Sequence, residues 1–240
     1  MEKIPQWPIA QKGEKELWDG IIQEDHAILR VLADNAAIAP QVRKCLAGPP
    51  QTCLEVGIGP LGVGVSGFLP EIPARFVVDP LPPVSLEHVS DLSGKSSEQL
   101  RTYIRRQRGA IGYVQACGEE IPIRSESMDL IICCNVIDHA SQPDAILREI
   151  YRILKPARLF FFDVDTFSML GLVKWYSWTK YAHKDEILVT THPYRMYEAD
   201  VVRRLRSCEF QLRKVYGHTC MGNLIEHALK STYVGRKCAP

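Results

Sequence analysis

A glycine-rich loop follows the first short apolar run, and its residues suit a nucleotide-like ligand. Gly57-x-Gly59-x-x-Gly62 formally satisfies the dinucleotide-binding spacing, and Asp79 ends the next apolar run about 20 residues later. Glycines let the backbone turn sharply and approach a ligand without a Cβ in the way. The carboxylate of Asp79 would accept hydrogen bonds from two ribose hydroxyls, so the pair predicts a nucleoside site.

Glu55 lies two residues before the first glycine, where a nicotinamide-binding loop usually has an apolar residue. A carboxylate there orients the loop and attracts a cation. A pyrophosphate is bound best at the start of a long helix with a strong dipole. The stretch 62–67 is rich in glycine and β-branched residues and is therefore poorly suited to form such a helix. The loop therefore favours a nucleoside that carries positive charge. A nicotinamide cofactor and a plain glycine turn stay open as alternatives.

Further segments complete a resemblance to the class I S-adenosylmethionine-dependent methyltransferases, specifically their small-molecule group. The resemblance covers roughly residues 50–165, with an extension to 234. Its most specific part is an amphipathic helix, residues 147–156, that ends in Lys-Pro. The other matching segments are Glu55-x-Gly57-x-Gly59, Val77-Val78-Asp79-Pro80, Glu119-Glu120-Ile121-Pro122 with Ser127–Ile131, and Asn135-Val136-Ile137-Asp138-His139.

The resemblance implies S-adenosyl-L-methionine as the cofactor and gives particular residues a place around it. Gly57 and Gly59 would line its amino-acid part, with Glu55 supporting the ammonium group. The remaining positions are Asp79 at the ribose, Leu81 (or Pro80) beside the adenine, Gly118 and Glu119 at the adenine border, and Asn135 beneath the methionine part.

The chain departs from the family pattern at three places. The third glycine of the family would fall at Leu61, and this chain has Gly62 one place later. Cys117 stands where an acid commonly meets the adenine amino group, and Ala157-Arg158 replaces a glycine pair. None of these changes removes a residue that methyl transfer requires, so we expect an active enzyme.

A hydroxyl acceptor needs a base that works near neutral pH, which points to histidine. His139 follows the fourth strand at the carboxyl edge of the sheet, where open α/β folds bind ligands. It is the first candidate base, and packing under the lid is its alternative role. His192, beside Pro193 and Tyr194, is the second candidate. Asp138 is expected to cap the next helix.

Short apolar runs that alternate with helix-sized intervals must position these residues. Strands apolar on both faces predict an α/β fold with a doubly wound, mostly parallel, seven-stranded Rossmann-like sheet. The expected strands are 52–56, 75–79, 111–116, 129–134, 158–164, 209–216 and 224–234, and the expected helices are 96–108, 142–154 and 197–207.

Two parts are expected along the chain. Residues 1–48 form an N-terminal helical lid with one amphipathic helix over 14–37, and residues 49–240 form the methyltransferase domain. An insertion at about 166–195 carries Trp175, Tyr176, Trp178 and Tyr181, which either line the acceptor site or anchor the insertion. Asp25 and His26 either face the acceptor or lie on an exposed face.

Composition sets limits on compartment and partners. The 240 residues contain no apolar run near 18 residues and no signal-peptide core at the N-terminus, so we expect a soluble, cytoplasmic protein without a membrane partner. Eight cysteines without any C-x-x-C pair predict reduced thiols and no metal site. The net charge of +1 is unevenly distributed along the chain. Residues 1–100 hold 8 basic and 13 acidic side chains, whereas residues 201–240 hold 8 basic and 2 acidic ones.

The leading hypothesis is a methyltransferase that acts on a small-molecule acceptor at a hydroxyl oxygen. The alternative is a nucleic-acid (RNA) methyltransferase or RNA-binding relative that uses the arginines of 101–108 and the basic residues of 203–214. Few aromatic residues interleave with these arginines and no recognition motif accompanies them, so we expect no nucleic-acid partner. A homo-oligomer stays open.

Overall fold

The computed structural model describes residues 7–86, 95–167, 196–216 and 228–238, and its centre is one seven-stranded sheet. β1 to β5 pair in parallel, and β7, which pairs antiparallel with β5 and β6, is the strand that runs in the opposite direction among those described. The predicted α/β fold is thereby confirmed. The sheet order is β3-β2-β1-β4-β5-β7-β6, with β1 Thr52–Val56, β2 Ala74–Asp79, β3 Gly112–Gln115, β4 Met128–Cys134, β5 Leu154–Phe167, β6 Phe210–Tyr216 and β7 Ala228–Lys237.

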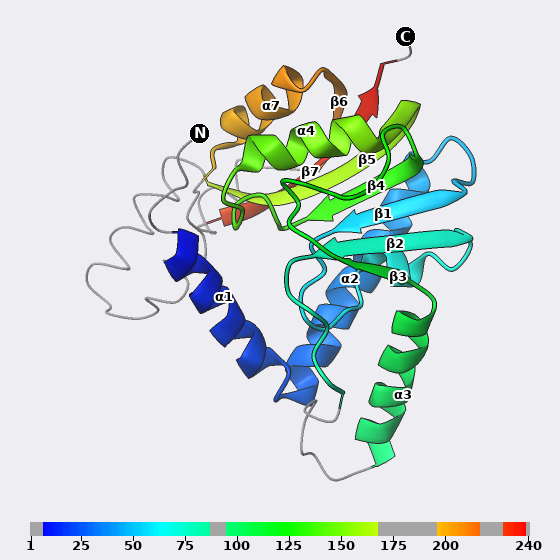
Figure 1. Ribbon diagram of the computed structural model, residues 1–240, viewed down its shortest axis with the longest axis vertical. Helices are drawn as coiled ribbons and strands as arrows, with labels where there is room; N and C mark the ends of the chain where they lie inside the picture. Colours follow the sequence, from blue (N-terminus) through cyan, green and yellow to red (C-terminus); the bar gives the residue numbers. More distant parts are fainter. Residues whose placement is uncertain (1–6, 87–94, 168–195, 217–227, 239–240) are drawn as a thin grey trace.

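Helices cover both faces of this sheet (Figure 1). α4 (Pro143–Ile153) and α7 (Glu198–Ser207) cover one face, and α2 (Asp25–Cys45) covers the other with the short helix η1 (Val65–Phe68). α3 (Lys95–Gly109) packs its Ile104 against residues of α2 and of the glycine loop. The layers are those of a doubly wound sheet.

The run Phe160-Phe161-Phe162 shows why the central strands are apolar on both faces. All three rings are buried, because successive side chains of a strand point to opposite faces. Phe160 and Phe162 join the core under α4 and α7, and Phe161 joins the core under α2. Each fully buried ring stabilises the fold by roughly 1.5–3 kcal/mol.

The N-terminal section differs from the single helix predicted over 14–37, and that prediction is wrong. Two helices form, α1 (Trp7–Ile21) and α2, separated by a turn in which Gln23 N–H donates to Gly20 and Glu24 N–H donates to Ile21. Glycine near the end of α1 weakens helix continuation, and Glu24 is extended. Most of the predicted insertion, residues 168–195, lies outside the described residues.

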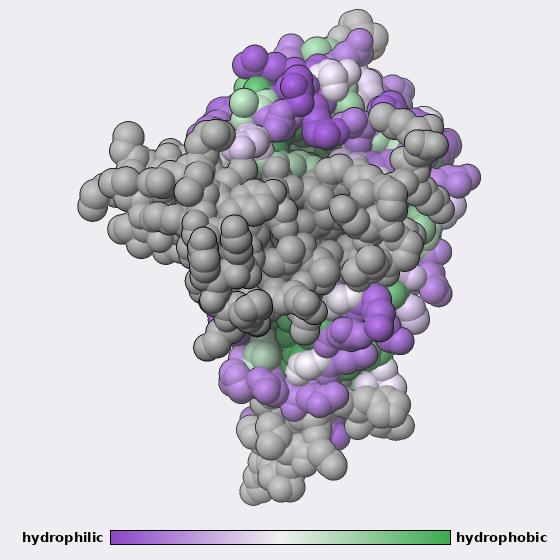
Figure 2. Space-filling model, turned by 90° about the vertical axis from the view of Figure 1, so that its left-hand side faces the viewer, coloured by the Kyte–Doolittle hydropathy of each residue, from purple (hydrophilic) through white to green (hydrophobic). Residues whose placement is uncertain are grey.

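α1 stands beside the arrowheads of β1, β2 and β4, at the carboxyl edge of the sheet (Figure 1). The coloured residues on this side of the molecule are mainly hydrophilic, with smaller hydrophobic areas between them (Figure 2). Within the described ranges, the helices are all too short or too polar to span a membrane.

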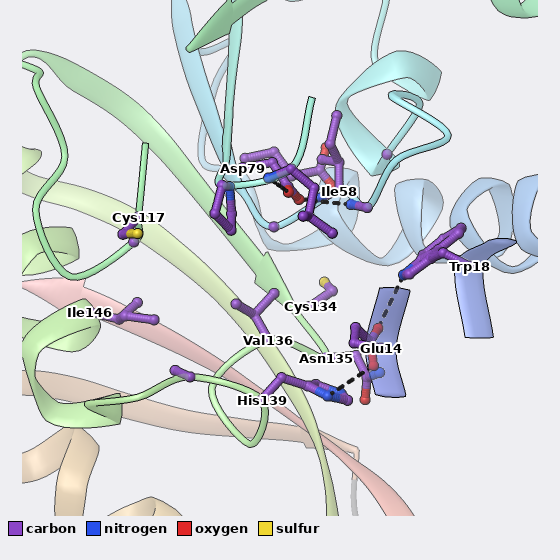
Figure 3. Close-up of a pocket in the computed structure, with 18 of the residues that line it drawn as sticks. Glu14, Trp18, Ile58, Asp79, Cys117, Cys134, Asn135, Val136, His139 and Ile146 are labelled. Atoms are coloured by element: carbon purple, nitrogen blue, oxygen red, sulfur yellow. Dashed lines mark hydrogen bonds and ion pairs between the residues drawn. The ribbon is translucent and has the colours of Figure 1, made fainter. Parts of the chain in front are cut away.

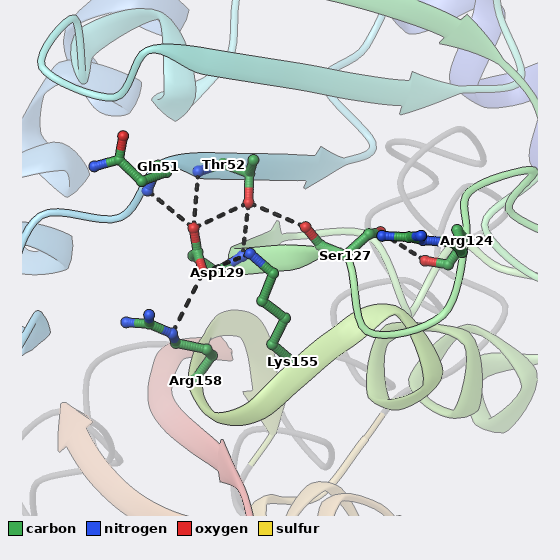
Figure 4. Close-up of polar contacts among 7 residues, drawn as sticks. All are labelled: Gln51, Thr52, Arg124, Ser127, Asp129, Lys155 and Arg158. Carbon is green, nitrogen blue, oxygen red and sulfur yellow. Dashed lines mark hydrogen bonds and ion pairs between the residues drawn. The ribbon is translucent and has the colours of Figure 1, made fainter.

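The amino ends of β1, β4 and β5 are joined through one buried carboxylate, Asp129 (Figure 4). Its Oδ2 accepts hydrogen bonds from the backbone N–H of Gln51 at 3.0 Å and of Thr52 at 3.1 Å. Its Oδ1 accepts from Lys155 Nζ at 3.0 Å and lies 3.3 Å from Arg158 Nε. Burial alone would raise the pKa of Asp129, but these donors outweigh burial and lower it.

We expect Asp129→Asn to lower the free energy of unfolding by about 2–3 kcal/mol, because Lys155 loses its charged partner and the backbone donors lose their strongest acceptor. Because the folded pKa lies below the unfolded value, the contribution is present above about pH 4 and is lost as pH falls through the folded pKa. Urea unfolding at several pH values measures this, and the gap between variant and parent should narrow in acid.

Arg158→Ala is the matched control, since it removes a half-exposed partner of the same carboxylate. It should cost less than about 1 kcal/mol. If both variants lowered the free energy of unfolding equally, the buried hydrogen bonds of Asp129 would contribute no more to stability than its half-exposed ion pair with Arg158.

Candidate active site

A cavity of about 290 Å³ opens at the carboxyl edge of the sheet (Figure 3). Its wall combines the ends of β1, β2 and β4 with the two N-terminal helices and the start of α4. The residues that line it are Glu14, Trp18, Val31, Asp34, Asn35, Glu55, Gly57, Ile58, Gly59, Gly64, Asp79, Pro80, Leu81, Cys117, Gly118, Glu119, Cys134, Asn135, Val136, His139, Ala140 and Ile146.

Asp79, at the end of β2, holds the glycine loop in place. Its Oδ2 accepts hydrogen bonds from the backbone N–H groups of Ile58 and Gly59, both at 2.9 Å, and its Oδ1 accepts from Leu81 at 2.9 Å. Burial raises the pKa of Asp79, and the three donors oppose that rise. A carboxylate has about four acceptor positions, so capacity remains for a ligand hydroxyl.

Glu55, inside β1, reaches across to the segment after the loop. Its two oxygens accept from the backbone N–H of Val65 at 2.8 Å and of Ser66 at 2.7 Å, at the start of η1. A Cβ at Gly64 would lie 2.4 Å from this carboxylate, so glycine is required for the approach. Burial raises the pKa of Glu55. The residue lines the cavity and also positions the loop.

Gly62 lies one position after the place of the family's third glycine, and the loop turns at this residue. Gly62 has a φ of +67°, and its N–H closes a turn onto Gly59. The guanidinium of Arg108, from α3, donates to the carbonyl of Leu61 through Nε at 3.0 Å and Nη2 at 2.8 Å, and to that of Val84 at 2.8 Å. One arginine thus fixes the backbone carbonyls on the outer side of the loop.

Glu119, which the family resemblance places beside the adenine, holds the start of α4. Its Oε1 accepts from Ser141 N–H at 3.0 Å, Ser141 Oγ at 2.7 Å and Gln142 N–H at 3.2 Å. Carboxylates are favourable at helix N-termini, and here the carboxylate comes from another element. Gln142 is the N-cap of α4, so the prediction that Asp138 caps this helix is wrong.

Asn135 follows β4 with a left-handed backbone, φ +55°. Its N–H donates to the carbonyl of Asp163 on β5 at 2.9 Å, which bends the chain away from the sheet and into the cavity wall. Asparagine tolerates this conformation better than most residues. The next residue, Val136, lies against Gly57, where a Cβ would come within 2.5 Å of its side chain.

His139 lies on the same wall, beside Glu14 (Figure 3), and near Asp138 as well. Its Nδ1 is 3.3 Å from Glu14 Oε2, and its Nε2 is 3.7 Å from Asp138 Oδ2. The imidazole is only 13% exposed.

The N-terminal helices contribute residues that sequence reasoning missed. Trp18 lies over the glycine loop, so that a Cβ at Gly59 would meet its ring at 2.3 Å. Asp34 and Asn35, from α2, line the opposite wall, and Asn35 donates to the carbonyl of Val63 at 3.1 Å. The four-residue spacing of Glu14 and Trp18 indicates that they share one helix face. No nearby sequence pattern indicates that this face packs on the glycine loop.

The structure brings together every predicted site residue that it describes. Those in the cavity wall are Glu55, Gly57, Gly59, Asp79, Leu81, Gly118, Glu119, Asn135 and His139. His192 lies outside the described residues. His26 is exposed and pairs with Glu24, so it does not face the cavity.

The wall suits S-adenosylmethionine in its chemistry. Positive φ at Gly57 and Gly59 turns the backbone so that the loop lines the cavity without side chains. Carboxylates match the cationic groups and hydroxyls of that cofactor, and Leu81, Val136 and Ile146 offer apolar surface for its base. Among the described lining residues there is no lysine or arginine that would repel a sulfonium.

Comparisons with known proteins agree with this description. Residues 79–162 match a family described as a methyltransferase domain. No curated protein matches the sequence. The fold is similar to YcgJ of Bacillus subtilis, with a TM-score of 0.59 and 13% identity over 84% of this chain and 98% of that one.

Two further solved structures share the fold. A candidate methyltransferase from Bacillus halodurans C-125 has a TM-score of 0.58 and 15% identity, covering 85% of this chain and 99% of that one. Phosphoethanolamine N-methyltransferase 2 of Haemonchus contortus, solved with phosphomonomethylethanolamine and S-adenosylhomocysteine, has a TM-score of 0.57 and 13% identity, covering 86% and 53%.

We expect Gly59→Ala to lower the free energy of unfolding by about 1–3 kcal/mol, because its Cβ collides with the ring of Trp18 and its φ of +68° is strained for alanine. Gly48→Ala, with no atom within 4 Å of its Cβ, is the matched control. Urea unfolding of each variant, alone and with Trp18→Ala, measures the collision. The cost of Gly59→Ala should fall when Trp18 is absent, and an unchanged cost would contradict the contact.

Proposed function

We propose that the chain is a class I S-adenosylmethionine-dependent methyltransferase that methylates a small molecule on a hydroxyl oxygen. The methyltransferase domain matched by residues 79–162 and the shared fold support this proposal. The observation that carries the proposal is His139 in the cavity wall, held against a carboxylate at 3.3 Å. Oxygen acceptors benefit from such a base, because a neutral hydroxyl must lose its proton.

The chain's own residues divide the work between holding the cofactor and preparing the acceptor. S-adenosylmethionine, when bound, supplies a methyl group that is already activated by its sulfonium. We assign Gly57, Gly59 and Glu55 to its amino-acid part and Asp79 to its ribose. Leu81, Gly118, Glu119 and Asn135 complete the wall around it.

His139 acts as the base in this proposal. The imidazole would accept the proton of the acceptor hydroxyl, with Glu14 Oε2 lying 3.3 Å from Nδ1 and Asp138 Oδ2 lying 3.7 Å from Nε2. α1 contributes Glu14 and Trp18 to this part of the cavity wall. In-line transfer then depends on how the wall orients the acceptor. His192 remains the second candidate base.

Several of the basic side chains that suggested RNA binding are engaged within the chain, which favours a small acceptor. Arg108 is bound to loop carbonyls, and others form ion pairs on the surface. These pairs are Arg105 with Glu98, Arg203 with Asp200, Arg204 with Asp144 and Lys214 with Glu198.

S-adenosylhomocysteine should raise the melting temperature of the protein by about 5–10 °C at a concentration 100-fold above its Kd, and NAD should not. Asp79→Ala should abolish most of that shift, because the ribose loses its acceptor and the glycine loop loses its anchor. Glu120→Gln, an exposed acid outside the cavity, is the control and should keep the full shift. An unchanged shift in Asp79→Ala would overturn the assignment of Asp79.

His139→Gln should lower the rate of methyl transfer at least 100-fold while leaving the affinity for S-adenosylhomocysteine within about twofold. The assay incubates hydroxylated small molecules with S-adenosylmethionine labelled with ¹³C in the methyl group and identifies the product by NMR. A labelled methyl ether supports the proposal. Full turnover in the variant would remove His139 as the base, and label found only on nitrogen or carbon would overturn the oxygen acceptor.

A further inference from the structure

Glu14 connects the N-terminal helix to two separate parts of the cavity (Figure 3). Its Oε1 accepts a hydrogen bond from Trp18 Nε1 at 3.0 Å, and its Oε2 lies 3.3 Å from His139 Nδ1. Glu14 and Trp18 are four residues apart in α1, so both point from the same face of the helix. That face is turned toward the glycine loop on one side and toward the proposed base on the other.

The enclosure of Glu14 makes these contacts significant. Its side chain is only 20% exposed, and its Oε2 atom is buried. A carboxylate shielded from water is unfavourable unless a donor or cation compensates. Asp79 is close enough for its charge to repel that of Glu14. The groups placed to compensate it are the Trp18 N–H, which donates to Oε1, and the imidazole of His139 beside Oε2.

Trp18 ties this arrangement to the docking of α1. The ring fills the space above Gly59, and among the described side chains of α1 only Glu14 lines the cavity besides it. Displacement of α1 would remove the ring from the loop and the carboxylate from His139 together. The helix precedes the region that matches the methyltransferase domain, residues 79–162.

We propose that Glu14 is a positioning residue for His139, and that the base reaches its working state only when α1 is docked with Trp18 over Gly59. This inference rests on the proposed function, because it takes His139 to be the base. Two carboxylates face the ring, Glu14 from α1 and Asp138 from the segment after β4. Only the first can leave with the lid.

The test follows the ring of His139 by NMR in the complex with S-adenosylhomocysteine, using His139→Gln to assign its signals. In Glu14→Gln, which keeps the size of the side chain and an acceptor for Trp18, the ¹⁵N signal of the ring Nδ1 should move, because its charged neighbour at 3.3 Å is gone. The affinity for S-adenosylhomocysteine should stay within about twofold. Glu16→Gln, an exposed acid on the same helix, is the matched control and should leave the signal unchanged.

Trp18→Ala tests the link to docking. It should weaken S-adenosylhomocysteine binding several-fold and move the Nδ1 signal toward its position in Glu14→Gln, with little further change in the double variant. An unmoved signal in Glu14→Gln, or in Trp18→Ala, would overturn the inference. The NMR measurement does not depend on turnover. Full turnover in His139→Gln would therefore refute the proposed function while leaving the measured coupling between α1 and the ring intact.

Discussion

Three carboxylates that accept hydrogen bonds from backbone N–H groups, two of them buried and one half-buried, set the shape of the cavity. Asp79 holds the glycine loop, Glu55 holds the start of η1, and Glu119 holds the start of α4. Each of them comes from a strand end or an adjoining loop and restrains a separate segment of chain. Because a buried carboxylate must be satisfied, these segments are fixed by the protein itself. The wall is thus organised before any ligand enters.

The opposite end of the sheet uses the same device for stability. Asp129 joins the amino ends of β1 and β4 through backbone donors and adds Lys155 from the start of β5. The two ends differ in how the charge is compensated. Asp129 has cationic partners, whereas the carboxylates of the cavity have mainly neutral N–H donors and so keep more of their negative potential.

The sequence allowed the sheet and most of the cavity wall to be predicted because both depend on short-range patterns. Apolar runs mark the strands, and glycines and acids at fixed spacing mark the strand ends. The break between α1 and α2 was missed, because the apolar spacing continues across it, although the first helix ends at Ile21, one residue after Gly20. The pairing of Glu14 with His139 was also missed. It joins residues 125 positions apart through packing, which no local pattern encodes.

The carboxylate-rich wall has a consequence for the end of the catalytic cycle. Transfer of a methyl group turns a sulfonium into a neutral thioether, so the bound cofactor loses one positive charge when it reacts. The wall contains Glu14, Asp34, Glu55, Asp79 and Glu119, and no lysine or arginine among its described residues. Its attraction therefore weakens at the moment the product forms. The charge distribution that favours loading with the reactant also favours departure of the spent molecule, without any movement of the sheet.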